Sequence, residues 1–230
     1  RNGWDASRNG YELLGTPAGW DESAAENSHA AIFDGTSTLI PKDLTCRGTY
    51  GRVTAAAWVK TTASADQTIV SFDRDRYWEL GVTDDGRVRW RVCGENGVPV
   101  DLVSSTRIDD GKWRHVVGSF DRGALRVFVD GEAAGSARAE SRVLGHGEAS
   151  EGVVGKGFIG GLDDVRVYLE RAMTRNNARG LYYETQHKNP VAQGALWRIH
   201  IDADGADGEI KRLLPEVADI CDIELDPRDP

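Results

Sequence analysis

The chain has 230 residues, of which 40% are hydrophobic and 28% charged, and this composition is too apolar for wholesale disorder. Its formal net charge of −9 repels a phosphate backbone, so nucleic acid is not an expected partner. No apolar run approaches the roughly 20 residues that a bilayer crossing requires, and no membrane span is expected.

Short β-rich runs alternate with glycine, aspartate and asparagine between residues 29 and 169, which is typical of an antiparallel sandwich. The dipeptides Asp85-Gly86, Asp110-Gly111 and Asp130-Gly131 indicate hairpin turns. We expect strands over residues 30–34, 53–60, 68–72, 77–82, 88–92, 113–120, 125–129 and 164–169. So many strands imply two packed sheets.

The predicted hairpin of residues 77–82 and 88–92 has two unlike faces, because side chains alternate along a strand. One face is apolar and is expected in the core: Trp78, Leu80, Val82, Val88, Trp90 and Val92. The other face is interpreted as an exposed part of a ligand-binding surface, with Tyr77, Glu79, Arg89 and Arg91. The alternative is a solvated ladder of ion pairs, which adds little stability.

The pattern changes after Tyr168. Residues 173–183 predict a short helix with Thr174 as its N-cap, and residues 189–194 read as a linker. A strand is expected over 195–201, and the charged run 209–214 is interpreted as a short helix that Pro215 would end. The predicted division is a sandwich over 1–186 and, over 187–230, a C-terminal extension or the start of a further segment.

Five motifs in order resemble one known family: residues 5–10 (DASRNG), 31–36 (AIFDGT), 113–117 (WRHVV), 127–131 (VFVDG) and 160–168 (GGLDDVRVY). Together they resemble the laminin-G-like branch of the concanavalin-A-like lectin/glucanase superfamily, over about residues 5–184. The resemblance implies an all-β, two-sheet antiparallel jelly-roll sandwich with one concave face. Members usually open with an apolar strand, whereas only residues 1–4 precede the first motif here. Either the sequence lacks that strand, or residues 195–201 supply it; residues 195–201 could equally begin another domain.

Catalysis is not expected. Glycan-cleaving relatives carry closely spaced carboxylates on one strand, and no Glu-x-Asp-x-x-Glu arrangement occurs here. The resemblance therefore implies a non-catalytic carbohydrate-binding or adhesion module of a secreted or cell-surface protein, with a glycan or a surface protein as partner. The alternatives are a structural or protein-interaction domain of a larger surface protein, and a divergent polysaccharide-degrading enzyme.

Aromatic residues outside the predicted core are the candidates for stacking on a sugar ring. Trp20 is the best of them, because its glycine- and aspartate-rich surroundings read as a loop; the alternative is that it is buried beneath that loop. Trp113 and His115 are interpreted as structural residues of a strand.

The resemblance also implies a structural calcium ion at the sandwich edge. Its predicted ligands are Asp163, the Asn9-Gly10 turn and Asp34, which offer the hard oxygen atoms that calcium prefers. The alternative is that Asp163 merely hydrogen-bonds the neighbouring turn. Three cysteines, Cys46, Cys93 and Cys221, permit one disulfide, for which Cys46 and Cys93 are the candidate pair.

Overall fold

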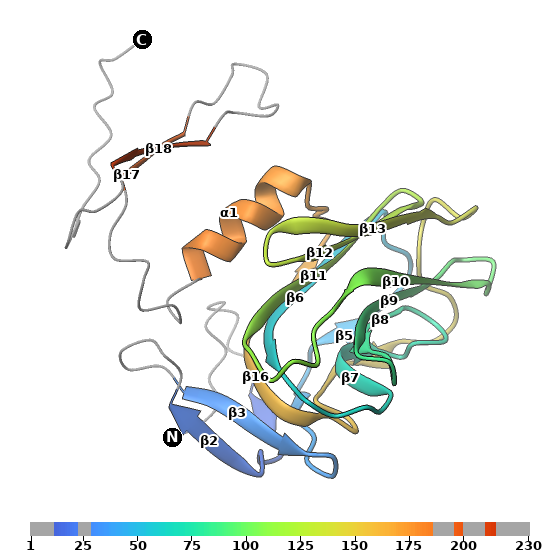
Figure 1. Ribbon diagram of the computed structural model, residues 1–230. Coiled ribbons are helices and arrows are strands. Elements are labelled where there is room, and N and C mark those ends of the chain that lie inside the picture. Colours follow the sequence, from blue (N-terminus) through green and yellow to red (C-terminus); the bar gives the residue numbers. More distant parts are fainter. Residues whose placement is uncertain (1–11, 23–28, 186–195, 200–209, 215–230) are drawn as a thin grey trace.

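The computed structural model describes residues 12–22, 29–185, 196–199 and 210–214, and within them the chain forms a sandwich of two antiparallel sheets (Figure 1). The smaller sheet has the strand order β10 (Pro99–Arg107), β9 (Arg87–Cys93), β8 (Trp78–Val82), β7 (Gln67–Phe72) and β15 (Val153–Val154). The larger sheet has the order β13 (Glu132–Arg138), β12 (Ala124–Val129), β11 (Arg114–Asp121), β6 (Arg52–Lys60), β16 (Ile159–Leu169), β3 (His29–Asp34) and β2 (Gly19–Glu22). The expected all-β sandwich is confirmed.

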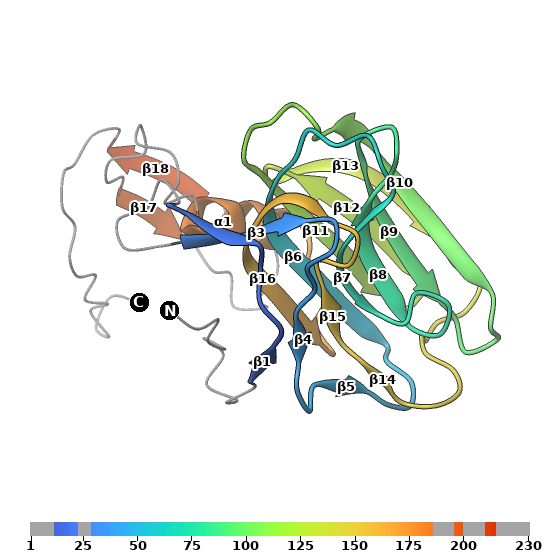
Figure 2. The ribbon, with the colours of Figure 1, turned by 90° about the horizontal axis from the view of Figure 1, so that it is seen from below.

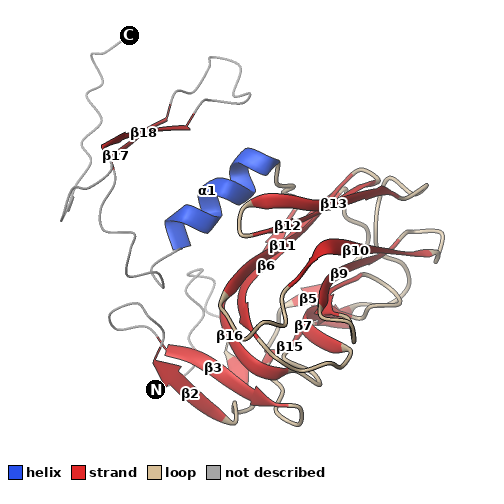
Figure 3. Cartoon of the chain, viewed as in Figure 1, coloured by secondary structure: helices blue, strands red, loops and turns tan. Residues whose placement is uncertain are grey.

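Short strand pairs close one end of the sandwich. β1 (Leu13–Leu14) pairs with β4 (Ile40–Pro41), and β5 (Thr45–Cys46) pairs with β14 (Ser150–Glu151). Figure 2 shows these short strands at the lower end of the sandwich, near β15 at the edge of the smaller sheet. Figure 3 shows how far strands predominate over helix in the described chain.

The main core lies between the two sheets and follows the predicted alternation of the β8–β9 hairpin. The side chains of Trp78, Leu80 and Trp90 are all fully buried. Trp90 packs on β11 at Gly118, where an added Cβ would lie 2.4 Å from Trp90 Cε3. The larger sheet therefore needs a residue without a side chain at this position.

A second apolar cluster lies on the outer face of the larger sheet, beneath helix α1 (Arg175–Thr185) (Figure 1). The predicted N-cap is confirmed, because the backbone N–H of Asn177 donates to Thr174 Oγ1 at 3.3 Å. At the other end of the helix, Trp58 Nε1 donates to Thr185 Oγ1 at 3.0 Å. The cluster consists of Ala56, Val117, Phe128, Met173, Ala178 and Leu181.

Some predicted elements need correction. Asp110-Gly111 is not a hairpin turn, since it joins β10 to β11 and these strands belong to different sheets. The predicted helix over 209–214 is wrong, because β18 (Ile210–Leu214) pairs with β17 (Leu196–Ile199) as antiparallel strands. β10 escaped prediction because its proline and aspartate are uncommon in strands, although an edge position tolerates them.

Several expectations lie outside the described residues, among them the opening residues 1–4, the linker 189–194 and Cys221. The boundary between a sandwich and an extension at residue 187 therefore stays a prediction. Cys46 and Cys93 are both buried and free, and burial raises the pKa of the Cys46 thiol to about 12. Among the described residues, no helix has the length and apolar character needed to cross a membrane.

Candidate functional site

The outer face of the β8–β9 hairpin is closed by ion pairs instead of being open to a ligand. Glu79 accepts hydrogen bonds from Thr68 Oγ1 at 2.9 Å and from Arg89 Nη2 at 2.7 Å. Arg89 also pairs with Asp66, and Arg74 Nη1 lies 3.7 Å from Glu79 Oε1. The side chain of Glu79 is only 2% exposed and that of Arg89 only 10%. Their predicted exposure is wrong, because the loops that carry Asp66 and Arg74 fold over them.

Tyr77 and Arg91 also differ from the predicted surface. Tyr77 precedes β8, is fully buried, and donates its hydroxyl hydrogen to the carbonyl of Glu148 at 3.2 Å. Arg91 lies nearer the rim, with Nη1 at 3.0 Å from Asp101 and Nη2 at 2.9 Å from Asp75. The ion pairs of the alternative interpretation are present. The Glu79–Arg89 pair is removed from solvent, whereas the Asp75 and Asp101 side chains that pair with Arg91 are 70% and 42% exposed.

The same face bears on catalysis. A retaining glycosidase needs two carboxyl groups about 5 to 5.5 Å apart. On β8 and β9, the positions that share the outer face with Glu79 are Gly81, Arg87, Arg89, Arg91 and Cys93, and none is acidic. Glu79 is held by the Arg89 guanidinium and the Thr68 hydroxyl, and the nearby carboxylate of Asp66 is paired with the same Arg89.

Trp20 lies on the edge strand β2, opposite Ala31, and is 41% exposed. Both the loop conformation and the burial that were considered from the sequence are therefore wrong. The exposed indole is available for contact at the edge of the larger sheet, and its role in sugar binding stays a prediction.

The residues predicted for calcium are only partly brought together. Asp34 lies opposite Ile159 on β16, four residues along that strand from Asp163. At about 3.3 Å per residue this separates them by roughly 13 Å, too far to share an ion whose ligands lie at about 2.3 to 2.6 Å. Asn9 and Gly10 lie outside the described residues. A calcium site formed by Asp163 and the Asn9-Gly10 turn therefore stays a prediction.

Both aspartates have hydrogen-bond partners within the chain. Asp34 Oδ1 accepts hydrogen bonds from the backbone N–H and the hydroxyl of Thr36 and of Ser37, each at 2.9 Å. These bonds hold the pKa of Asp34 well below its usual range. Asp163 Oδ1 accepts a hydrogen bond from the backbone N–H of Asp164 at 2.7 Å, as its alternative role in the turn requires.

His115 occupies a structural position, as expected. It is 2% exposed, and its ring lies 5.3 Å from that of Trp58 beneath the helix. Burial, together with the neighbouring charge of Arg166, lowers the pKa of His115 to about 3. The imidazole is therefore neutral in the folded protein near pH 7.

A row of polar residues crosses the outer face of the larger sheet. The register aligns Tyr168, Thr54, Ser119, Arg126 and Ser136 on adjacent strands. The segment that leads into α1 covers the middle of the row: Thr54 Oγ1 donates to the carbonyl of Arg171 at 2.9 Å, and the N–H of Met173 donates to Ser119 Oγ at 2.8 Å. Arg126 and Ser136 lie beyond this cover.

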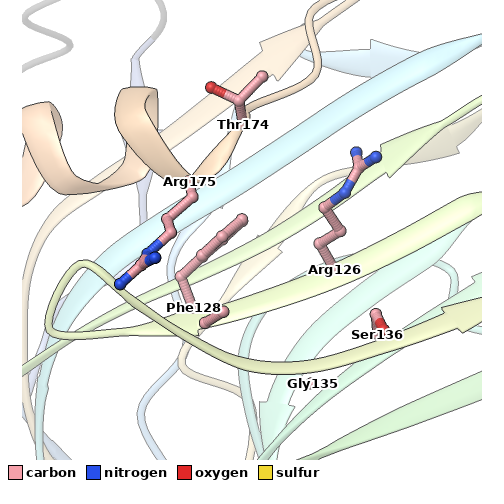
Figure 4. A pocket seen from close by; sticks show the side chains of 7 residues that line it. Arg126, Phe128, Gly135, Ser136, Thr174 and Arg175 are labelled. Atoms are coloured by element: carbon pink, nitrogen blue, oxygen red, sulfur yellow. The ribbon is translucent and has the colours of Figure 1, made fainter. Parts of the chain in front are cut away.

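The uncovered end of the row is an open hollow of about 430 Å³ beside the start of α1. Figure 4 shows the Phe128 ring between Arg126 and Arg175, with Ser136 on the neighbouring strand. Arg175 pairs with Glu132, whereas the guanidinium of Arg126 has no partner among the described residues. The lining consists of Arg126, Phe128, Ala133, Gly135, Ser136, Thr174 and Arg175.

Sequence reasoning did not identify this hollow. The alternation along 125–129 does place Arg126 and Phe128 on the face opposite the core, and that signal was available. Their contact with Ser136 and Thr174, however, depends on strand register and on the path of the chain before α1.

Family comparison agrees with this architecture. Residues 34–178 match a laminin-G family model described as the concanavalin A-like lectin/glucanases superfamily. The chain therefore belongs to this superfamily, and the resemblance drawn from its motifs is confirmed. A search of curated proteins finds no match.

Several solved structures share the fold. The binding domain of Paraclostridial Mosquitocidal Protein 1 superposes with a TM-score of 0.62 at 14% identity, over 90% of this chain and 60% of that one. Domain 4 of AbnA, a GH43 extracellular arabinanase from Geobacillus stearothermophilus in complex with arabinotriose, gives 0.59 at 18% identity, over 75% and 88%. The ligand-binding domain of botulinum neurotoxin serotype D with N-acetylneuraminic acid gives 0.58 at 13%, over 84% and 50%.

The matched structures are longer than this chain or distant from it in sequence. This chain spans about 60% of the length of the mosquitocidal binding domain that it matches. At 13 to 18% identity, the likeness shows a common fold and leaves the ligand to be argued from this chain's own residues.

Proposed function

We propose that this chain is a non-catalytic carbohydrate-binding module, and that its glycan binds in the hollow beside α1. The observation that carries the proposal is the lining of that hollow. The exposed Ala133 and the edge of the buried Phe128 lie beside the polar groups of Arg126 and Ser136, and small-molecule sites likewise combine apolar lining with a few polar groups. The volume of about 430 Å³ lies within the range of about 300 to 1,000 Å³ for such sites.

Two further points support a binding role. The sugar ligands named for the arabinanase domain and the serotype D neurotoxin domain show that this fold is used for glycan binding elsewhere. In this chain, Glu79 is neutralised by Arg89 on a strand pair that supplies no second carboxylate to the same face.

Export and calcium belong to the same proposal. The described similarity to a domain of an extracellular arabinanase supports a secreted or cell-surface location. A structural calcium ion would be held by Asp163 and the Asn9-Gly10 turn, and Asp34 is no longer included because of the strand register. Calcium would stabilise the fold at the sandwich edge and take no part in a reaction.

A glycan array, followed by titration calorimetry on each glycan that binds, tests the proposal. Ser136→Trp places an indole in the hollow and should abolish binding. Val103→Trp is the matched control, because Val103 is 42% exposed on β10 of the other sheet, and it should bind as the wild type does.

Two results would contradict the proposal. Failure of the wild type to bind any glycan, with and without calcium, would exclude a carbohydrate-binding role for the array's sugars. Release of reducing ends from a bound polysaccharide would show that the module is an enzyme after all.

A role in protein binding is the second candidate. Leu14 and Ile40 are directly paired on β1 and β4, and they are 43% and 37% exposed. Such an apolar pair suits a protein contact, although single exposed apolar residues are common on protein surfaces. Replacement of both by serine would weaken capture of a surface protein and leave glycan binding unchanged.

A further inference from the structure

We propose that the hollow beside α1 selects a glycan that bears a carboxylate, and that Arg126 is the residue that binds the carboxylate. This inference rests on the proposed glycan-binding function and names the class of sugar at the same site. Arg126 lies in the middle of β12, is half-buried, and has no ion pair or hydrogen bond from its guanidinium to any described residue.

Arg126 differs in this respect from the other arginines that lie partly buried on the two sheets. Those arginines each have a carboxylate partner in the chain, as seen at Arg52, Arg89, Arg91, Arg114 and Arg166. The residue as a whole is half-buried, but its guanidinium nitrogens are accessible to solvent and make no ion pair within the described residues. An anionic ligand can therefore form charge-assisted hydrogen bonds with this guanidinium without first displacing a carboxylate.

The charge around the hollow favours an anion, although the whole chain carries −9. No acidic residue lines the hollow. Glu132, at its edge, is engaged by Arg175 and lies 3.7 Å from Arg179 Nε. Arg138 follows Ser136 by two positions on the same face of β13, and its guanidinium likewise has no partner among the described residues.

The remaining groups fit a sugar ring that carries the carboxylate. A planar guanidinium binds a carboxylate through two parallel hydrogen bonds, which fixes the orientation of the ligand. Ser136 lies directly across from Arg126, and its hydroxyl can bond a sugar hydroxyl. The exposed side chain of Ala133 and the small accessible part of Phe128 give the C–H face of the ring an apolar contact. Thr174 contributes less, since its hydroxyl already donates to Asn177 Oδ1 at 2.9 Å.

The test uses oligosaccharides that contain uronic or sialic acid, each compared with its own methyl ester. The ester keeps the size and the hydroxyl groups but removes the charge. Loss of a charge-assisted bidentate contact predicts that esterification weakens binding to the wild type by about tenfold to a hundredfold. Arg126→Gln should lose the same factor for the acid and bind acid and ester alike.

Two controls separate this loss from damage to the fold. Arg126→Gln should melt at the temperature of the wild type, because the guanidinium has no partner among the described residues. Arg142→Gln removes an exposed arginine outside the hollow and should keep the full preference for the acid, which excludes an effect of net charge alone.

Each outcome distinguishes the inference from the proposed function. Equal binding of acid and ester by the wild type, or an acid preference that survives in Arg126→Gln, overturns the inference and leaves a glycan-binding module in place. Absence of binding to every glycan overturns the proposed function itself. Displacement of the oligosaccharide by inorganic sulfate at equal concentration would also overturn the inference, since it would show a general anion site instead of a sugar carboxylate site.

Discussion

The contact between Trp90 and Gly118 offers a sharp test of how the two sheets pack. Gly118 lies in the middle of β11, and a Cβ added there would lie 2.4 Å from Cε3 and 2.5 Å from Cδ2 of the Trp90 indole. No real Cβ approaches another heavy atom so closely. The indole is fully buried and its ring centroid lies 5.5 Å from that of Trp78, so it has little room to move.

The sign of the effect of Gly118→Ala follows from this geometry. In an unstrained site without a clash, glycine to alanine stabilises a protein by about 0.4 to 1 kcal/mol through the unfolded state. Overpacking a core costs about 1 to 3 kcal/mol. We therefore expect Gly118→Ala to lower the free energy of unfolding by about 1 to 2 kcal/mol, which at about 2 to 4 °C per kcal/mol lowers the melting temperature by roughly 2 to 8 °C.

A double-mutant cycle identifies the indole as the cause. Trp90→Ala alone should cost about 3 to 5 kcal/mol, because it leaves a cavity. In the double variant the new methyl group enters that cavity, so the total cost should fall short of the sum by about 1 kcal/mol or more. Urea unfolding monitored by circular dichroism measures all four free energies.

A matched control is available in α1. A Cβ added at Gly180 meets nothing within 4 Å, so Gly180→Ala should raise stability by about 0.5 to 1 kcal/mol. If Gly118→Ala were as stable as the wild type or more so, or if the two core substitutions were additive, the described contact between the sheets would be wrong.

Three other predictions concern charged groups. Arg89→Met should cost about 3 to 5 kcal/mol in urea unfolding because it leaves Glu79 buried without its partner, and adding Glu79→Leu should recover much of that loss; an unchanged single variant would refute the buried pair. Folding lowers the pKa of His115 from about 6.5 to about 3, so the unfolded state binds the proton more tightly than the folded state. The free energy of unfolding should therefore be highest above pH 6.5 and should fall as the pH decreases towards 3. His115→Phe should flatten that decline in melting temperature, and an equally steep decline would assign it to other groups. Calcium at 100 times its dissociation constant should stabilise the wild type by about 2.7 kcal/mol and Asp163→Ala much less, whereas equal melting temperatures in calcium and in chelator would exclude the ion.

Local patterns were enough to predict the architecture and much of the core. The alternation in residues 78–82 and 88–92 correctly assigned Trp78, Leu80 and Trp90 to the interior, because a buried sheet face requires apolar residues at every second position. The helix after Tyr168 and its cap at Thr174 were predicted for a similar reason, since capping uses residues that are close in sequence.

Tertiary structure alone decided which polar residues are accessible. Glu79 and Arg89 lie on the predicted outer face, but the loops before and after β7 bring Asp66 and Arg74 onto them and exclude solvent. Arg126 is exposed to a hollow because the register of three strands aligns it with Ser119 and Ser136. The chain before α1 covers Ser119 and leaves Ser136 open. Met173 and Ser119 are far apart in the sequence, so no short-range pattern predicts their contact.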